Sequence, residues 1–99
     1  PRFNILAKNV TVVAGQRAIL PCSVDYLGSY KVVWQSPRGK ILTLDDRRII
    51  FDDRVSLERP YVKEWNLHLH NVKTSDAGFY QCQINTDPVQ IREVMLHVN

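Results

Sequence analysis

The two cysteines of this chain, Cys22 and Cys82, constrain its fold more than any other feature. Each lies in a stretch where apolar residues recur at every second position, which is the pattern of a strand with one buried face. The apolar positions are Ala18, Leu20, Cys22 and Val24 in one stretch and Tyr80, Cys82 and Ile84 in the other. Both thiols are therefore expected to face a core. A disulfide between two strands follows, with two buried free thiols as the alternative.

The disulfide would place the chain in an oxidising, extracellular compartment. Closing a loop of this length stabilises a fold by about 4 kcal/mol in the chain-entropy model. Neither cysteine belongs to a CxxC pair or lies beside a cluster of histidines, so a zinc site is not expected.

Length and composition indicate one folded domain over residues 1–99, with 44% hydrophobic and 23% charged residues. The net charge of +3 comes from basic residues that are spread along the chain, so nucleic acid is not an expected partner. The chain has no apolar run long enough for a transmembrane helix and no signal peptide at its start. A secretion signal or a membrane anchor is therefore expected to lie outside these residues.

Short stretches rich in β-branched and aromatic residues, separated by turn residues, predict an all-β fold. The expected strands are 9–13, 17–24, 30–35, 40–44, 48–51, 55–58, 65–70, 78–85 and 90–98. With a bridge between an early and a late strand, this arrangement is most simply two packed sheets.

Trp34 lies in "KVVWQ" between the two cysteines, and Tyr80 lies two residues before Cys82 in "DAGFYQC". This spacing resembles the immunoglobulin fold, in which a tryptophan packs on the inter-sheet disulfide and a tyrosine hydroxyl bonds to the backbone, here near Asp76. Arg54 and Asp76 resemble the ion pair at the bottom of variable-type domains. The segment "LTLDDRRIIF" leaves room for strands C′ and C″, which predicts a variable-type immunoglobulin sandwich.

Longer segments resemble the first immunoglobulin domain of the DIP, Dpr, lachesin and IgLON proteins. They are "NVTVVAGQRAILPCSVDYLGSYKVVW" and "DDRVSLERPYVKEWNLHLHNVKTSDAGFYQCQINTDPV", above all its "CQINTDP". The resemblance implies a neuronal cell-surface recognition protein that is tethered to the membrane and contains further domains. It also implies that the first domain pairs with the first domain of a partner through the sheet of strands C, C′, F and G.

Residue parity predicts which side chains this sheet presents. Alternation assigns Tyr30, Val32 and Trp34 to the core, and Lys31, Val33 and Gln35 to the outer face. The predicted outer face is apolar with a polar rim, which is typical of a protein-binding surface. The resemblance implies that the docking residues are Val33, Gln35, Leu42, Leu44, Gln83, Asn85, Val89 and Ile91.

Two alternatives remain open for this face. In the first alternative, strand C″ or neighbouring loops cover the apolar side chains, since single exposed valines carry no information. "ILTL", residues 41–44, fits either of two registers, and a shift of one residue exchanges its two faces.

Asn9-Val10-Thr11 is an N-glycosylation sequon, with an unmodified edge asparagine as the alternative. His68 and His70 are two residues apart on one predicted strand, where a solvated sheet face is favoured over a metal site. We expect no metal and no cofactor.

No catalytic residues are predicted. The serines lack a glycine elbow, the paired aspartates fall in turns, and no glycine spacing suits a phosphate. The expected function is cell recognition or adhesion by docking on an immunoglobulin domain of the same or a related protein. The alternatives are a soluble or receptor-type domain that binds ligands with its loops, which would need longer loops, and an enzyme or lectin, which would need a cleft.

Overall fold

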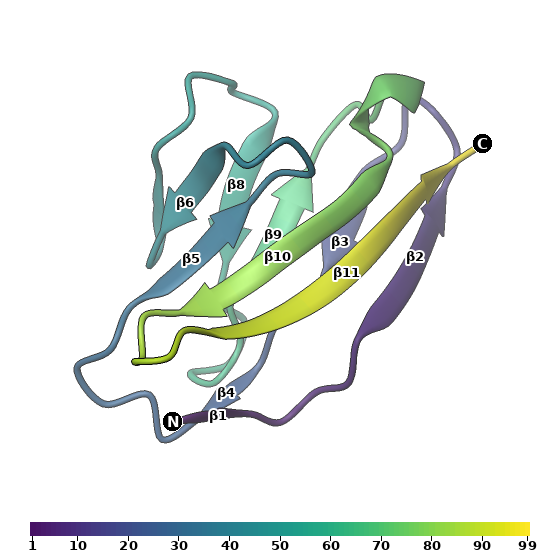
Figure 1. Cartoon of the computed structure of the whole chain (residues 1–99). Coiled ribbons are helices and arrows are strands. Elements are labelled where there is room, and N and C mark those ends of the chain that lie inside the picture. The colour runs from purple at the N-terminus through teal and green to yellow at the C-terminus, as the bar shows by residue number, and fades with distance from the viewer.

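Two β-sheets face each other across the core of the computed structural model, which describes residues Pro1–Asn99 (Figure 1). The larger sheet has the order β2-β11-β10-β5-β6-β7, with bounds Lys8–Val12, Gln90–Val98, Gly78–Ile84, Val32–Gln35, Ile41–Leu44 and Arg47–Arg48. The smaller sheet has the order β3-β9-β8, with bounds Ala18–Leu20, Asn66–Leu69 and Val55–Glu58. β1 (Arg2–Phe3) pairs with β4 (Val24–Asp25) at the amino-terminal end. The predicted all-β sandwich is confirmed.

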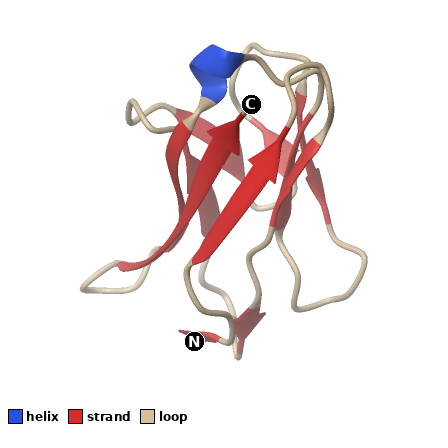
Figure 2. Cartoon of the chain, turned by 90° about the vertical axis from the view of Figure 1, so that its right-hand side faces the viewer, coloured by secondary structure: helices blue, strands red, loops and turns tan.

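Neighbouring strands are antiparallel except β2, which runs parallel to β11 from Lys8 beside Val94 to Val12 beside Val98. A short 3-10 helix, Thr74–Asp76, is the only helix (Figure 2). The structure contains no helix with the length and hydropathy needed to cross a bilayer. The domain measures 36 × 26 × 26 Å, and its two termini lie at opposite ends (Figure 1).

The core consists of inward-facing side chains from both sheets, which alternation along the strands places there. A disulfide between Cys22 and Cys82 joins the sheets through this core, as predicted. Trp34 is fully buried in the core, and its indole nitrogen donates a hydrogen bond of 2.7 Å to the carbonyl of Trp65. Every polar atom of the large Trp34 ring is thereby satisfied.

A network of polar contacts links β8 to the start of β10. The Arg54 guanidinium donates to both carboxylate oxygens of Asp76, at 2.8 and 3.1 Å, and also to Asp52. The Tyr80 hydroxyl donates to the carbonyl of Asp76 at 2.7 Å. Burial raises the pKa of Tyr80 to about 12, so this donor stays protonated. The predicted ion pair and tyrosine corner are both present.

Several strand boundaries differ from the predicted ones. Residues 17–24 divide into β3 and β4 around Pro21, which has no amide hydrogen for the ladder. β7 ends at Arg48 because the next two amides both bond to the carbonyl of Leu42, and Phe51 is fully exposed. β1 was not predicted because two residues carry no periodic signal.

The prediction that Tyr30 faces the core is wrong. β5 begins at Val32, and the amide of Tyr30 bonds to the carbonyl of Leu27 in the preceding turn. The side chain of Tyr30 is therefore 44% exposed. Strand parity has no meaning within a turn, so extending it backward from Val32 misplaced the ring.

Candidate protein-docking face

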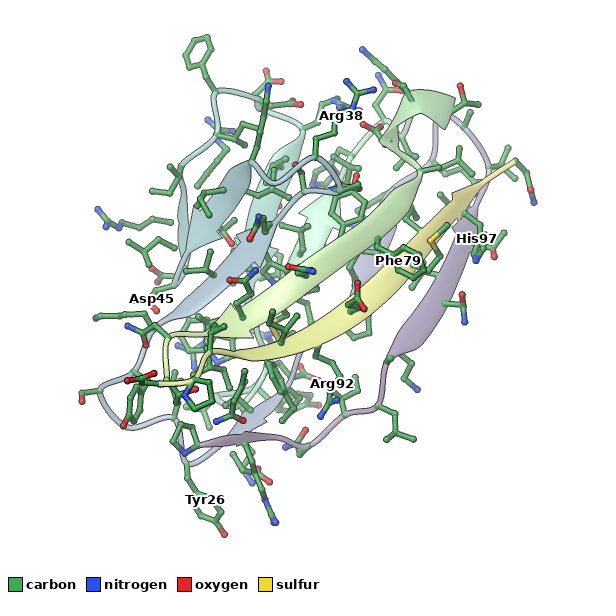
Figure 3. All side chains as sticks on the ribbon, in the orientation of Figure 1. Tyr26, Arg38, Asp45, Phe79, Arg92 and His97 are labelled. Atoms are coloured by element: carbon green, nitrogen blue, oxygen red, sulfur yellow. A yellow bond between two sulfur atoms is a disulfide. The ribbon has the colours of Figure 1, made fainter.

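The candidate site is the outward surface of β6, β5, β10 and β11, which we call the front face. Strand register arranges its side chains in two rows that cross the four strands. The first row contains Leu44, Val33, Gln83 and Ile91, and the second contains Ile41, Gln35, Gln81 and Glu93. In Figure 3, Asp45 marks the left end of this face and Phe79 lies toward its other end.

Apolar side chains occupy most of the first row. Val33 and Leu44 are directly opposite each other and half-buried, and Ile91 on β11 is 41% exposed. A sheet face turned to water normally carries polar residues. This contiguous apolar surface is therefore the kind that marks a protein-binding site.

Three glutamines form the centre of the front face. The side-chain nitrogen of Gln83 donates to the side-chain oxygens of Gln35, at 2.6 Å, and Gln81, at 2.8 Å. All three side chains are half-buried. Their mutual bonds fix the amides in one arrangement on a surface that is otherwise apolar.

Charged groups lie only around the margin of the front face. Lys31 pairs with Asp45 at 3.4 Å, Glu93 is exposed on β11, and Arg47 is exposed on the edge strand β7. Neither row lines any of the hollows in the molecular surface. A flat surface with an uncharged centre suits another protein better than a small molecule.

The placement of Leu42 on this face is wrong. A β-bulge shifts the register between Trp34 and Gln35, so that Thr43 lies opposite Trp34 while Ile41 lies opposite Gln35. Both Leu42, 4% exposed, and Thr43 are consequently buried against the core. Ile41 takes the outward position, and the sequence could not reveal this because both registers of "ILTL" were acceptable.

Asn85 and Val89 lie where the front face meets the loop between β10 and β11. The side-chain oxygen of Asn85 accepts a hydrogen bond of 2.7 Å from the amide of Lys31, which joins this loop to the start of β5. Val89 is exposed just before β11 begins. β7 lies at the edge of the sheet, so it covers neither residue nor the two rows.

Asn9 is exposed on β2, where it pairs in register with Met95 of β11. Met95 pairs in turn with Phe79 of β10, so Asn9 projects from the same side of the sheet as the front face. Its side-chain oxygen lies 3.0 Å from the ring nitrogen of His97. The position suits a modification that must project into solvent.

His68 lies on β9 of the smaller sheet and His70 directly follows this strand, with ring centroids 6.2 Å apart. Burial lowers the pKa of the half-buried His68, which favours its neutral form. The structure contains no group of three or more residues that could hold a metal ion.

Comparison with known proteins identifies relatives with the same architecture. The family described as immunoglobulin V-set domain matches residues 5–99. Human cell adhesion molecule 2 is 37% identical over 93 residues, which are 94% of this chain and 21% of that protein. Rat limbic system-associated membrane protein is 37% identical over 84 residues, which are 85% of this chain and 24% of that protein. The chain thus spans about a quarter or less of these relatives.

Solved structures agree with this result. A chain in the crystal structure of Dpr2 Ig1-Ig2 in complex with DIP-Theta Ig1-Ig3 superposes with a TM-score of 0.94 at 39% identity, covering 98% of this chain and 33% of that one. The ZIG-8 IG1 homodimer matches with a TM-score of 0.86 at 29% identity, covering 95% of this chain and 80% of that one. Both relatives were crystallised in protein complexes of immunoglobulin domains.

Proposed function

Because the chain belongs to the immunoglobulin V-set family, we propose that it is a cell-recognition domain that docks on the immunoglobulin domain of the same or a related cell-surface protein. The front face is the docking surface. The observation that carries the proposal is its flat first row, in which Leu44, Val33 and Ile91 remain accessible although they are apolar. Gln83 interrupts this row with a polar group of fixed orientation.

The relatives support this function. Cell adhesion molecule 2 is named for adhesion, and limbic system-associated membrane protein for its place in a membrane. A complex of Dpr and DIP proteins and a homodimer of ZIG-8 illustrate binding to a related chain and to an identical one. The protein that contains this domain is accordingly extracellular and anchored at the cell surface, where the disulfide between Cys22 and Cys82 is stable.

Docking through the front face explains its composition. The central residues are apolar or amide-bearing and the charges lie at the rim, as in interfaces that form between separately folded proteins. A face of this kind buries about 800 Å² on each partner, which is compatible with binding from micromolar affinity upward. Many copies on each of two surfaces strengthen weak single contacts. The domain acts by binding alone and has no catalytic role.

The docking residues in this proposal share outward orientation and position on or beside the two rows. They are Val33, Gln35, Ile41, Leu44, Gln81, Gln83, Asn85, Val89 and Ile91. Asn9 is proposed as a glycosylation site because its sequon lies on an exposed strand of a secreted domain.

The test is substitution of the first row by charge. Val33→Asp and Ile91→Asp each place an unpaired carboxylate in the buried centre of the interface, so either should abolish docking. Sedimentation equilibrium from micromolar to several hundred micromolar measures self-association, and pull-downs with related first immunoglobulin domains measure docking between different chains. Both variants should keep the free energy of unfolding within about 1 kcal/mol of the parent, since the sites are on the surface.

Ile19→Asp is the matched control. Ile19 is exposed on β3 of the smaller sheet, so this variant introduces the same charge on the opposite side of the domain. It should dock like the parent. Equal loss in the control, or unchanged docking of Val33→Asp, would contradict the proposal.

A further inference from the structure

A hollow of about 520 Å³ lies between the loops at the amino-terminal end of the sandwich, and we call it the loop hollow. The connections from β4 to β5, from β6 to β7 and from β8 to β9 border it, and the buried side chains of Val24 and Trp65 also line it. In Figure 3, Tyr26 and Asp45 mark two of these borders. A hollow of this size can hold a small ligand, and it is separate from the two rows of the front face.

Arg59, which follows β8, has a fixed orientation at the border of the loop hollow. Its guanidinium carbon lies 3.6 Å from the centroid of the Trp65 ring. Its Nε donates to the carbonyl of Glu64 at 3.2 Å, and its Nη2 donates to the carbonyl of Val62. Nε and Nη2 share one edge of the planar group, so the edge formed by Nη1 and Nη2 keeps its two donors. Such an edge holds a carboxylate by two parallel hydrogen bonds.

Arg59 also differs from the other cations that line the loop hollow, because each of those has a carboxylate partner. Lys31 pairs with Asp45 at 3.4 Å, and Lys63 pairs with Asp25 at 3.0 Å. The hydrogen bonds of Arg59 go to backbone carbonyls, which carry no net charge. The positive charge of Arg59 is therefore available to an anionic ligand.

The rest of the lining favours a sugar over a simple anion. Tyr26 and Tyr30 border the loop hollow and are 80% and 44% exposed, so their rings offer apolar faces on which the C–H face of a sugar can pack. Tyr26 has a φ of +56°, which is uncommon for a bulky residue and persists only where the surroundings enforce it. Asp46 is exposed at the same border. Its carboxylate accepts hydrogen bonds from hydroxyl groups, whereas it repels an ion such as phosphate.

We propose that the loop hollow binds a sugar that bears a carboxylate. Arg59 holds the carboxylate, Tyr26 and Tyr30 pack against the sugar ring, and Asp46 accepts from its hydroxyls. Sialic acids and uronic acids share this chemistry, and the experiment below distinguishes them. The site lies apart from the front face, so it gives the domain a second ligand and does not depend on the proposed function.

The first experiment is an NMR titration of the isotope-labelled, oxidised 99-residue chain. The ligands are sialyllactose, a hyaluronan tetrasaccharide that carries uronic acids, lactose as a neutral sugar, and acetate as a carboxylate without a sugar. At least one acidic sugar should shift the Nε–H signal of Arg59 and the amide signals of residues 26–31. It should bind at least about tenfold more tightly than lactose or acetate. The acidic sugar that does so identifies the source of the carboxylate.

The second experiment compares two variants that each lose one positive charge, Arg59→Gln and Arg38→Gln. Arg38 is exposed in the turn between β5 and β6, at the other end of the domain from Tyr26 (Figure 3). Binding of the acidic sugar should weaken at least about tenfold in Arg59→Gln and stay unchanged in Arg38→Gln.

A second pair of variants leaves Arg59 in place, because its contact with Trp65 also supports the fold. Asparagine tolerates a positive φ, so Tyr26→Asn should unfold at the same urea concentration as the parent, yet bind the acidic sugar less tightly. Tyr61→Asn is the matched control, since Tyr61 is 74% exposed and does not line the loop hollow. It should bind like the parent.

The outcomes separate this site from the front face. The inference is overturned if neither acidic sugar binds, if lactose binds as tightly, or if Arg59→Gln and Arg38→Gln bind alike. Signal shifts confined to the region of His68 also overturn it, because Arg59 borders a second hollow there on the smaller sheet. Val33→Asp should bind the sugar like the parent. Failure of the sugar to bind therefore leaves the proposed function intact, and failure of docking leaves the sugar site intact.

Discussion

Arg54 and Asp76 form an ion pair that joins the residue before β8 to the 3-10 helix. Burial of the Asp76 carboxyl opposes its ionisation, but hydrogen bonds from Arg54 and from the amide of Lys73 outweigh this effect and lower the pKa of Asp76. The carbonyl oxygen of Asp76 also accepts a hydrogen bond from the Tyr80 hydroxyl. One residue thus connects β8, the 3-10 helix and β10.

This lowered pKa predicts acid sensitivity. The unfolded chain binds the proton near pH 3.8 and the folded chain only at lower pH, so the stabilisation is complete above the unfolded pKa and is lost as the pH falls through the folded pKa. Asp76→Asn should be less stable than the parent by about 1–3 kcal/mol at neutral pH. Denaturant titrations from about pH 7 to about pH 2 should show this difference shrinking below about pH 4. A difference that stays constant with pH would mean that the charge of Asp76 does not contribute.

The roles of some individual residues could be predicted from the sequence, and those of others could not. Cys22, Cys82, Trp34 and Tyr80 were predictable because each combines a distinctive chemistry with a fixed spacing. The hydrogen-bonded arrangement of the three glutamines was not, because alternation gives the side of the sheet and says nothing about which amide donates to which.

The first residue of β10 is a glycine whose backbone conformation and surroundings disfavour a side chain. Gly78 opens this strand with φ of +142°, and a Cβ atom at that position would lie 2.8 Å from two side-chain carbons of Pro37. Pro37 belongs to the turn that joins β5 to β6. The absent side chain lets this turn close against β10, the central strand of the front face.

Gly78→Ala should therefore destabilise the domain by about 1–3 kcal/mol, because both backbone strain and overlap with Pro37 must be relieved. Gly28→Ala is the matched comparison, since Gly28 also has a positive φ but has open space around it. It should lose about 1–2 kcal/mol, from the left-handed backbone alone, and less than Gly78→Ala loses. Urea unfolding of both variants measures the difference, and equal losses would show that the contact with Pro37 is unimportant.

At the level of whole strands, β6 explains the one docking residue that was misplaced. Parity assumes an unbroken register, and the bulge opposite Trp34 and Gln35 breaks it. Strands β5, β10 and β11 have no such irregularity on the front face, so their outward residues were predicted correctly. Bulges depend on how the chain packs in three dimensions, which is why a four-residue segment gives no warning of one.

For the whole molecule, the family and the architecture were predictable, and the comparisons confirm both. An early and a late cysteine, with a tryptophan and a tyrosine at set distances, define the sandwich more strongly than any individual strand does. The composition of the front face becomes apparent only when strands distant in the sequence lie side by side.

The proposed glycan at Asn9 yields a prediction at this scale. β2 is separated from β5 by β11 and β10, so a glycan on Asn9 lies beside the front face without covering Val33. Secreted protein should lose mass on enzymatic removal of N-glycans, whereas Asn9→Gln and Thr11→Ala should show no such loss and Thr11→Ser should behave like the parent. All of these proteins should dock equally well. A parent without a glycan, or one whose docking depends on the glycan, would contradict the prediction.

The parallel pairing of β2 with β11 has a mechanical consequence. β11 contributes Ile91 and Glu93 to the front face and ends next to the carboxyl terminus (Figure 1). When a partner holds the front face and a force pulls on Asn99, the load runs along β11. It shears the hydrogen bonds to β10 and β2 together, since both ladders lie alongside the pulled strand. A strand that shares tension among many bonds resists extension far better than one whose bonds open in succession. The proposed docking surface is thus built on a strand whose ladders on both sides would share the pull that binding transmits.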